Sequence, residues 1–213
     1  VHLLNILAGN INKKGGAFVM NKADYLQFPG ESKDMVATKG LGVEKIGPYV
    51  NQLFDKVGTA AQPIVEALIV YNSNPCYTLR DTNRVKAAMA KIPFVVSLTS
   101  YLDETAQQAD IVLPLHTFLE KLEDVPTSAG LPKRVVGLTK PVVDPLFDTR
   151  HPGDVIISLA AALDKAVADN FKWESYDACL ETLTAGIWDS LSEDGYAVLS
   201  EEAPGGNAAV NLS

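Results

Sequence analysis

Residues 66–98 read EALIVYNSNPCYTLRDTNRVKAAMAKIPFVVSL, and this stretch decides the fold. It contains two continuous apolar runs, at 66–71 and 94–98. Neither run alternates with polar residues, which is typical of strands that are buried on both faces of a sheet. The stretch therefore predicts two strands of a parallel sheet, separated by enough residues for a crossover connection.

The residues between these two strands predict a helix. Asp81 or Thr82 can cap its first turn, and the apolar positions that follow have helical spacing. The helix is expected to run to about Lys91, because Pro93 cannot continue it. Strand, helix and strand in this order predict a right-handed crossover between parallel strands.

Residues 103–120, DETAQQADIVLPLHTFLE, repeat this pattern in a shorter form. Asp103 can cap a short helix, and Glu104 is favourable in the first turn because the start of a helix carries positive partial charge. Residues 111–113 predict a third strand, which Pro114 ends because it has no N–H for a central ladder. Together these elements predict the α/β class, with a Rossmann-like, doubly wound, mainly parallel sheet and helices on both faces, a three-layer αβα arrangement.

The flanking segments divide the chain into three expected parts. Residues 1–48 predict a helix followed by a Gly-rich loop with a short strand at 17–20, and residues 49–200 the α/β domain. Residues 201–213 predict a linker or tail. The chain starts with Val rather than Met, so it is expected to be a fragment of a larger protein.

Further elements are expected inside the α/β domain. Apolar periodicity predicts helices at 49–57, 152–168 and 174–191, and a strand at 133–138. The acidic residues near 120–124 are most simply a solvated face.

Composition and charge limit the function classes. The net charge is −8 and the basic residues are scattered, which argues against nucleic-acid binding. No apolar run approaches the ~20 residues of a membrane span, so direct membrane insertion is not expected. Cys76 and Cys179 have no CxxC spacing, and the three histidines are isolated, so neither an iron–sulfur cluster nor another metal site is expected in this chain.

Two loops follow predicted strands directly. In an open parallel sheet, ligands bind outside the carboxyl ends of the strands. The loop 72–76 offers asparagine donors and acceptors for a nucleotide or a phosphate, and the loop 97–100 offers hydroxyl groups for a sugar or a base. The alternative for both loops is ordinary turn chemistry. No nucleophile–base pair is evident, so no catalytic residue is assigned.

Three blocks of sequence occur together in one order. They are LNILAGNINKKGG at 4–16, IVYNSNPCYTLRDTNRVKAAM at 69–89, and PFVVSLTSYLDETAQQADIVLPLHTFLE at 93–120. The combination resembles the molybdopterin-dependent oxidoreductases of the dimethyl-sulfoxide-reductase and formate-dehydrogenase type. The resemblance implies that this chain corresponds to the third domain of their large subunit. In that family this α/β domain binds one of two molybdopterin guanine dinucleotides.

The resemblance also implies which residues bind. It places the following residues at or near the nucleotide: Asn72, Ser73, Asn74, Pro75, Ser97, Thr99 and Asp110. For Thr105 and Asp110, internal bracing of the fold is the alternative, and it is the preferred role for Asp110. The Gly15–Gly16 pair would let the backbone approach closely.

Departures from the family pattern define a second hypothesis. The iron–sulfur cysteines, the residue that ligates molybdenum or tungsten and the final β-barrel of the family lie outside these residues, so the fragment alone is expected to be inactive. Many members carry Asp where Thr99 stands here. The sequence of residues 97–120 is similar to that of large subunits of membrane-attached respiratory complexes, such as alternative complex III and menaquinone reductase. The alternative is therefore a structural or interaction domain that kept the fold without the cofactor.

Partners and compartment follow from the same resemblance. It implies contacts with the remaining domains of the large subunit, and with iron–sulfur and membrane subunits of a respiratory complex. The parent protein is expected in the periplasm and associated with the membrane through those subunits, with the cytoplasm as the alternative.

Overall fold

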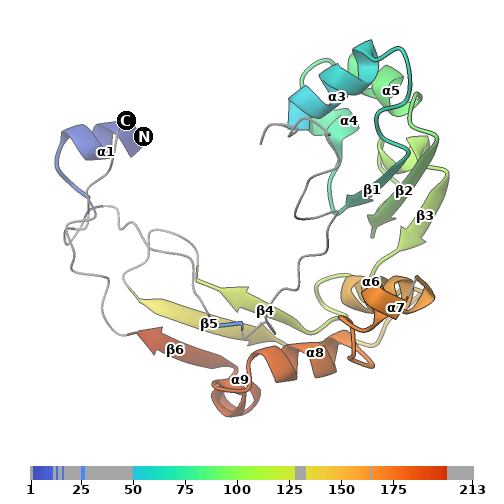
Figure 1. Cartoon of the computed structure of the whole chain (residues 1–213). Helices are drawn as coiled ribbons and strands as arrows, with labels where there is room; N and C mark the ends of the chain where they lie inside the picture. The colour runs from blue at the N-terminus through green and yellow to red at the C-terminus, as the bar shows by residue number, and fades with distance from the viewer. Residues whose placement is uncertain are drawn as a thin grey trace. The chain divides into compact units, whose positions relative to one another are not determined.

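The computed structural model describes residues 2–11, 13, 16, 25–26, 50–127, 133–163 and 165–200. The chain separates into two compact units (Figure 1). The first comprises residues 1–29, 118–142 and 164–213, and the second comprises 30–117 and 143–163. Among the helices of the described ranges, none is long and apolar enough to cross a membrane.

The second unit contains a three-stranded parallel sheet. Its strands are β1 (Ala67–Tyr71), β2 (Phe94–Thr99) and β3 (Ile111–Pro114), in the order β1-β2-β3. All three predicted strands are thus confirmed, and both pairings are parallel. The register places Val70 beside Ser97, and Ser97 beside Val112. The α/β class with a parallel sheet is therefore confirmed, whereas the doubly wound, three-layer form stays a prediction.

Helices cover one face of this sheet (Figure 1). They are α3 (Val50–Thr59), α4 (Pro75–Thr78) and α5 (Thr82–Met89). Phe54 and Val57 of α3 pack with Val85 of α5 and Val95 of β2 in one buried cluster. Asp81 caps α5, as predicted, with its carboxylate accepting a hydrogen bond from the Arg84 N–H. The core of this unit therefore lies between the helices and the sheet.

The opposite face of the sheet carries large apolar side chains with substantial exposure. These side chains are 37–50% exposed: Ile69, Tyr71, Phe94, Ile111 and Leu113. The sequence predicted strands buried on both faces, and this face is only half-buried in the described part of the chain.

The helix predicted after Asp103 is a single 3-10 turn, η1 (Ala106–Gln108). Asp103 still has the predicted capping role, because its Oδ1 accepts hydrogen bonds from the N–H groups of Thr105 and Ala106, at 3.0 and 2.8 Å. The turn is short because the chain must reach β3 at once.

The helix predicted at 152–168 is two helices. They are α6 (Pro152–Ala162) in the second unit and α7 (Lys165–Ala168) in the first. His151 caps α6, with its Nδ1 accepting from the Gly153 N–H at 3.0 Å. A parallel bridge between Leu115 and Arg150 brings the start of α6 beside the end of β3.

The first unit contains an antiparallel sheet that the sequence did not predict as a sheet. Its strands are β4 (Glu123–Pro126), β5 (Arg134–Thr139) and β6 (Tyr196–Ser200), in the order β4-β5-β6. Only β5 coincides with a predicted strand. The helix predicted at 174–191 is split into α8 (Tyr176–Leu183) and α9 (Trp188–Asp194).

The core of the first unit lies between this sheet and α8 and α9. Val136 and Ala197 pack with Leu180 and Leu191 in a buried cluster. The acidic run is not simply a solvated face, because Asp124 accepts hydrogen bonds from the hydroxyl groups of Tyr25 and Tyr176.

The N-terminal helix α1 (His2–Leu7) agrees with the sequence prediction. A Cβ on Gly16 would lie 2.0 Å from the Asn10 carbonyl oxygen, so the backbone approaches closely there, as the resemblance implied. Gly15, the strand at 17–20 and the tail at 201–213 lie outside the described residues. The predicted domain limits at 48 and 200 border such residues and stay predictions.

Candidate functional site

The candidate site is built on the loop that follows β1. At Asn72 the backbone turns with φ of 44°, a left-handed conformation that asparagine tolerates better than most residues. Its N–H donates to the Leu98 carbonyl oxygen at 3.0 Å, which holds the loop against the end of β2. Parallel strands end at one edge, so the loop stands where ligands of such sheets bind.

The side chain of Asn74 fixes the shape of this loop. Its Oδ1 accepts a hydrogen bond of 2.7 Å from the Thr105 hydroxyl, and its Nδ2 donates one of 2.6 Å to Glu104 Oε2. Thr105 is 0% exposed, and its oxygen also accepts from the Cys76 N–H at 3.0 Å. The Asn74 amide is thus engaged on both sides by protein groups. It positions the loop rather than offering its side chain to a ligand.

Glu104 is the charged member of this network. The hydrogen bond from Asn74 holds the pKa of its carboxyl group below its usual value, with backbone hydrogen bonding and the charge of Lys86 adding to the effect. The carboxylate therefore remains ionised and keeps accepting from Asn74 near neutral pH.

The neighbours of Asn74 are more open. Asn72 and Ser73 are exposed, and within the described part of the chain neither side chain makes a hydrogen bond. Pro75 is buried and starts α4. The loop therefore offers one carboxamide and one hydroxyl to solvent, on a backbone that Asn74 and Pro75 hold in place.

Thr99 and Ser97 on β2 have different environments. Thr99 ends the strand, and its hydroxyl bonds both the N–H and the carbonyl oxygen of Tyr101, each at 3.2 Å. It therefore closes a turn at the same edge as the 72–75 loop. Ser97 lies two residues before Thr99 on the same face and is 1% exposed, so it is buried inside the sheet.

Asp110 lies at the other end of the sheet. Its Oδ2 accepts from the Val95 N–H at 2.7 Å, and its own N–H donates to the Val95 carbonyl oxygen at 2.8 Å. Val95 is near the start of β2, and Asp110 directly precedes β3. The structure therefore separates Asp110 from the 72–75 loop and gives it the bracing position that was preferred for it.

Sequence reasoning missed several contacts that the fold makes at the end of β3. His116 Nδ1 lies 2.7 Å from the Thr149 hydroxyl, and the His116 N–H donates to the Arg150 carbonyl oxygen at 3.0 Å. Ser100 donates to the carbonyl oxygen of Leu115 at 3.1 Å. No local signal could reveal these contacts, because His116 and Thr149 are 33 positions apart.

Metal ligands are not clustered in the described ranges. Within them, no group of three or more His, Cys, Asp or Glu side chains is placed to hold a metal ion.

Comparison with known proteins covers most of the chain. Residues 1–162 match the family model described as Molybdopterin oxidoreductase. The molybdopterin-binding-like subunit of menaquinone reductase from Nitratidesulfovibrio vulgaris is 34% identical over 209 residues, which cover 96% of this chain and 28% of that protein.

Other relatives are more distant. The molybdopterin-containing subunit PhsA of thiosulfate reductase from Salmonella typhimurium is 28% identical over 70% of this chain and 22% of its own length. Dimethyl sulfoxide/trimethylamine N-oxide reductase from Cereibacter sphaeroides is 31% identical over 58% of this chain and 16% of its own length. The chain thus spans between 16% and 28% of the length of these curated relatives.

Solved structures share the fold, and acetylene hydratase is an example. Acetylene hydratase from Pelobacter acetylenicus superposes with a TM-score of 0.61 at 20% identity, covering 70% of this chain and 20% of that chain. At this identity the likeness concerns the fold alone.

Proposed function

The chain belongs to the molybdopterin oxidoreductase family, and on that premise we propose that it contributes to binding one guanine dinucleotide half of a molybdopterin cofactor. The observation that carries this proposal is the loop 72–75, held rigidly at the edge of the sheet where parallel strands end. A ligand bound there would meet a loop backbone that is already in position, which lowers the entropic cost of binding.

Each predicted residue has a specific role in this proposal. Asn72 and Ser73 contact the nucleotide through their exposed side chains. Thr99 closes the turn beside them, at the same edge of the sheet. Asn74 and Pro75 hold the loop in shape. The two remaining residues of the predicted set, Ser97 and Asp110, support the strands from inside the sheet and from its far end.

The residues fit the pterin group in part. The exposed carboxamide and hydroxyl suit a nucleotide, which needs donors and acceptors rather than metal ligands. The group itself would supply the molybdenum or tungsten chemistry, with the metal held by other domains. In this proposal, the residues of this chain bind and orient the cofactor. The parent protein carries out the electron transfer.

A structural role without cofactor is the second candidate. The relative that covers 96% of this chain is named molybdopterin-binding-like, which is not the wording used for the thiosulfate reductase subunit. Thr99 also favours the structural role. Its hydroxyl forms hydrogen bonds with the backbone of Tyr101, and this position has no carboxylate. In this case the domain holds partner subunits of a respiratory complex in place.

The experiment that separates the candidates is a cofactor analysis. The protein is purified from its own source, oxidised with acidic iodine and assayed for the fluorescent pterin derivative, with molybdenum and tungsten measured on the same sample. A pterin signal, together with molybdenum or tungsten near one atom per chain, supports cofactor binding. Neither pterin nor metal in a folded, assembled complex supports the structural role.

A variant tests the loop itself. We expect Asn74→Ala to lower the pterin content, because the loop loses its contacts to Glu104 and Thr105. Asn83→Ala is the matched control, since Asn83 is an exposed asparagine on α5. Equal pterin content in both variants and the parent would contradict the role of the loop.

A further inference from the structure

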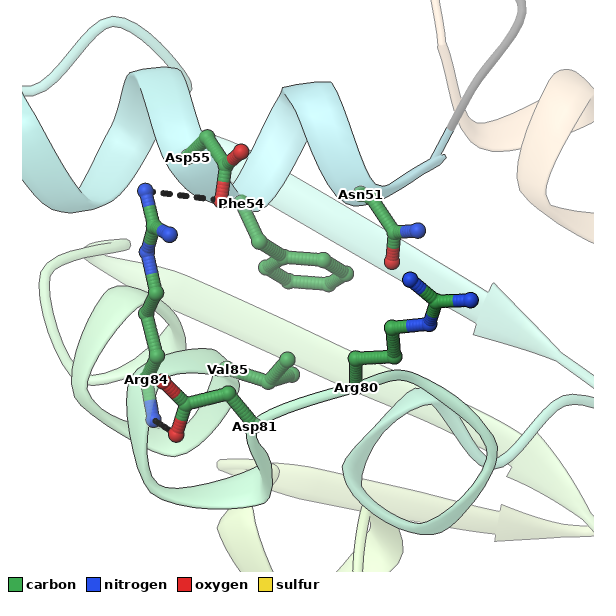
Figure 2. Close-up of a pocket in the computed structure, with 7 residues that line it drawn as sticks. All are labelled: Asn51, Phe54, Asp55, Arg80, Asp81, Arg84 and Val85. Atoms are coloured by element: carbon green, nitrogen blue, oxygen red, sulfur yellow. Dashed lines mark hydrogen bonds and ion pairs between the residues drawn. The ribbon is translucent and has the colours of Figure 1, made fainter.

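A cavity of about 210 Å³ lies between α3 and the start of α5, in the unit that contains the parallel sheet (Figure 2). Phe54 and Val85 contribute its apolar lining, and each is 3% exposed. The rest of the lining is polar or charged. None of the lining residues belongs to the set predicted for the nucleotide, so the cavity is separate from the proposed cofactor site.

Three of the four charged side chains around the cavity already have partners. Arg84 Nη2 lies 2.9 Å from Asp55 Oδ1, and Asp81 accepts from the Arg84 N–H at 3.2 Å as the cap of α5. Arg80 makes no hydrogen bond or ion pair within the described part of the chain. Figure 2 shows its guanidinium group and the side-chain amide of Asn51 directed toward one another, with the amide oxygen on the side of Arg80.

We propose that this cavity binds a small organic monocarboxylate, with the carboxylate on Arg80 and Asn51 and a short apolar body over Phe54 and Val85. A guanidinium fork matches a carboxylate in geometry and charge. The Asn51 amide supplies a further donor when it is turned so that its NH2 group lies on the side of Arg80. The cavity is smaller than the ~300–1,000 Å³ of pockets for drug-sized ligands, which limits the body to a few carbon atoms or one ring.

The charges around the cavity favour a carboxylate over a phosphate. Asp55 and Asp81 line the same cavity, and their charges oppose a dianion more strongly than a monoanion. An apolar lining also rewards a ligand with an apolar body, which inorganic phosphate lacks. Benzoate and butyrate are therefore suitable probes, and inorganic phosphate and benzamide are the corresponding controls.

The test is an NMR titration of the full chain with each probe. Benzoate is expected to shift the resonances of residues around the cavity saturably, and to bind at least about tenfold more tightly than benzamide, because benzamide has no charge for Arg80. Arg80→Gln is expected to weaken benzoate about tenfold or more, and Arg80→Lys to weaken it less, since lysine keeps the charge without the fork. Lys172→Gln removes an exposed cation from the other unit and is the matched control.

Specific outcomes would overturn the proposal. These are equal binding of benzoate and benzamide, equal loss in the Arg80→Gln and Lys172→Gln variants, or phosphate binding as tight as benzoate. Circular dichroism of each variant shows whether it is folded. If Arg80→Gln does not fold, Arg80→Lys together with the benzamide comparison decides the question.

Discussion

The hydroxyl of Thr105 donates a hydrogen bond of 2.7 Å to the side-chain carbonyl oxygen of Asn74, 31 positions earlier in the chain. The same hydroxyl oxygen accepts from the Cys76 N–H, so one fully buried side chain joins the turn before β3 to the loop after β1. The loop proposed to meet the nucleotide therefore depends on a residue that does not itself reach solvent.

The first prediction concerns Thr105. Thr105→Val keeps the shape of the side chain but leaves the Cys76 N–H and the side-chain oxygen of Asn74 without their partner. Each unsatisfied buried group costs about 1–3 kcal/mol, so we expect the free energy of unfolding to fall by about 2–4 kcal/mol. Urea denaturation measures it.

The matched control for this variant is Thr182→Val. The Thr182 hydroxyl donates to the Ala178 carbonyl oxygen on the exposed side of α8, so water can replace the contact. A change within about 0.5 kcal/mol is expected. A similar loss in both variants would show that the buried network has no special weight.

The second prediction concerns Asp110. Its carboxylate accepts from the Val95 N–H, and an amide oxygen can accept the same bond. Asp110→Asn should therefore retain most of the stability, whereas Asp110→Ala should lose about 1–3 kcal/mol because the N–H loses its acceptor. Denaturation of the two variants distinguishes them. Equal loss in both would mean that the negative charge, not the acceptor, is required.

The third prediction concerns alkaline pH. Burial, followed by the charge of Asp124 and the hydrogen bond to it, raises the pKa of Tyr176, and burial followed by the hydrogen bond to Asp124 raises that of Tyr25. Because the folded pKa exceeds the unfolded value of 10.0, the contribution to stability is complete below pH 10 and declines as the pH rises above it.

Tyrosinate absorbance and thermal unfolding between neutral and alkaline pH test this prediction. The Tyr176→Phe variant should have lower stability at neutral pH, but should lose less of it above pH 10. Parallel curves for the variant and the parent would refute the assignment of the alkaline loss to this tyrosine.

The fourth prediction concerns Asn72, whose φ is 44°. Glycine adopts this conformation without strain, whereas a β-branched residue does not. Asn72→Gly should change the free energy of unfolding by less than about 1 kcal/mol, and Asn72→Val should lower it by about 1–2 kcal/mol. If valine were tolerated as well as glycine, the left-handed turn would not be required for the fold.

The sequence by itself predicted the elements of the parallel sheet well. The three strands, α5 and its Asp81 cap follow from apolar runs and capping residues, which are signals carried within a few positions of the chain. The motif order also indicated the family, which the comparison confirmed. The loop after β1 could be named as a candidate site because it directly follows a strand.

The tertiary structure alone decided the rest. The sheet of β4, β5 and β6 pairs Arg134 with Ser200, and no local pattern specifies a partner so far along the chain. Likewise, only the fold shows that Asn74 is engaged by Glu104 and Thr105, and that Asp110 lies at the far end of the sheet. Periodicity and caps act over a few residues, whereas hydrogen-bond partners and burial depend on which segments the folded chain brings together.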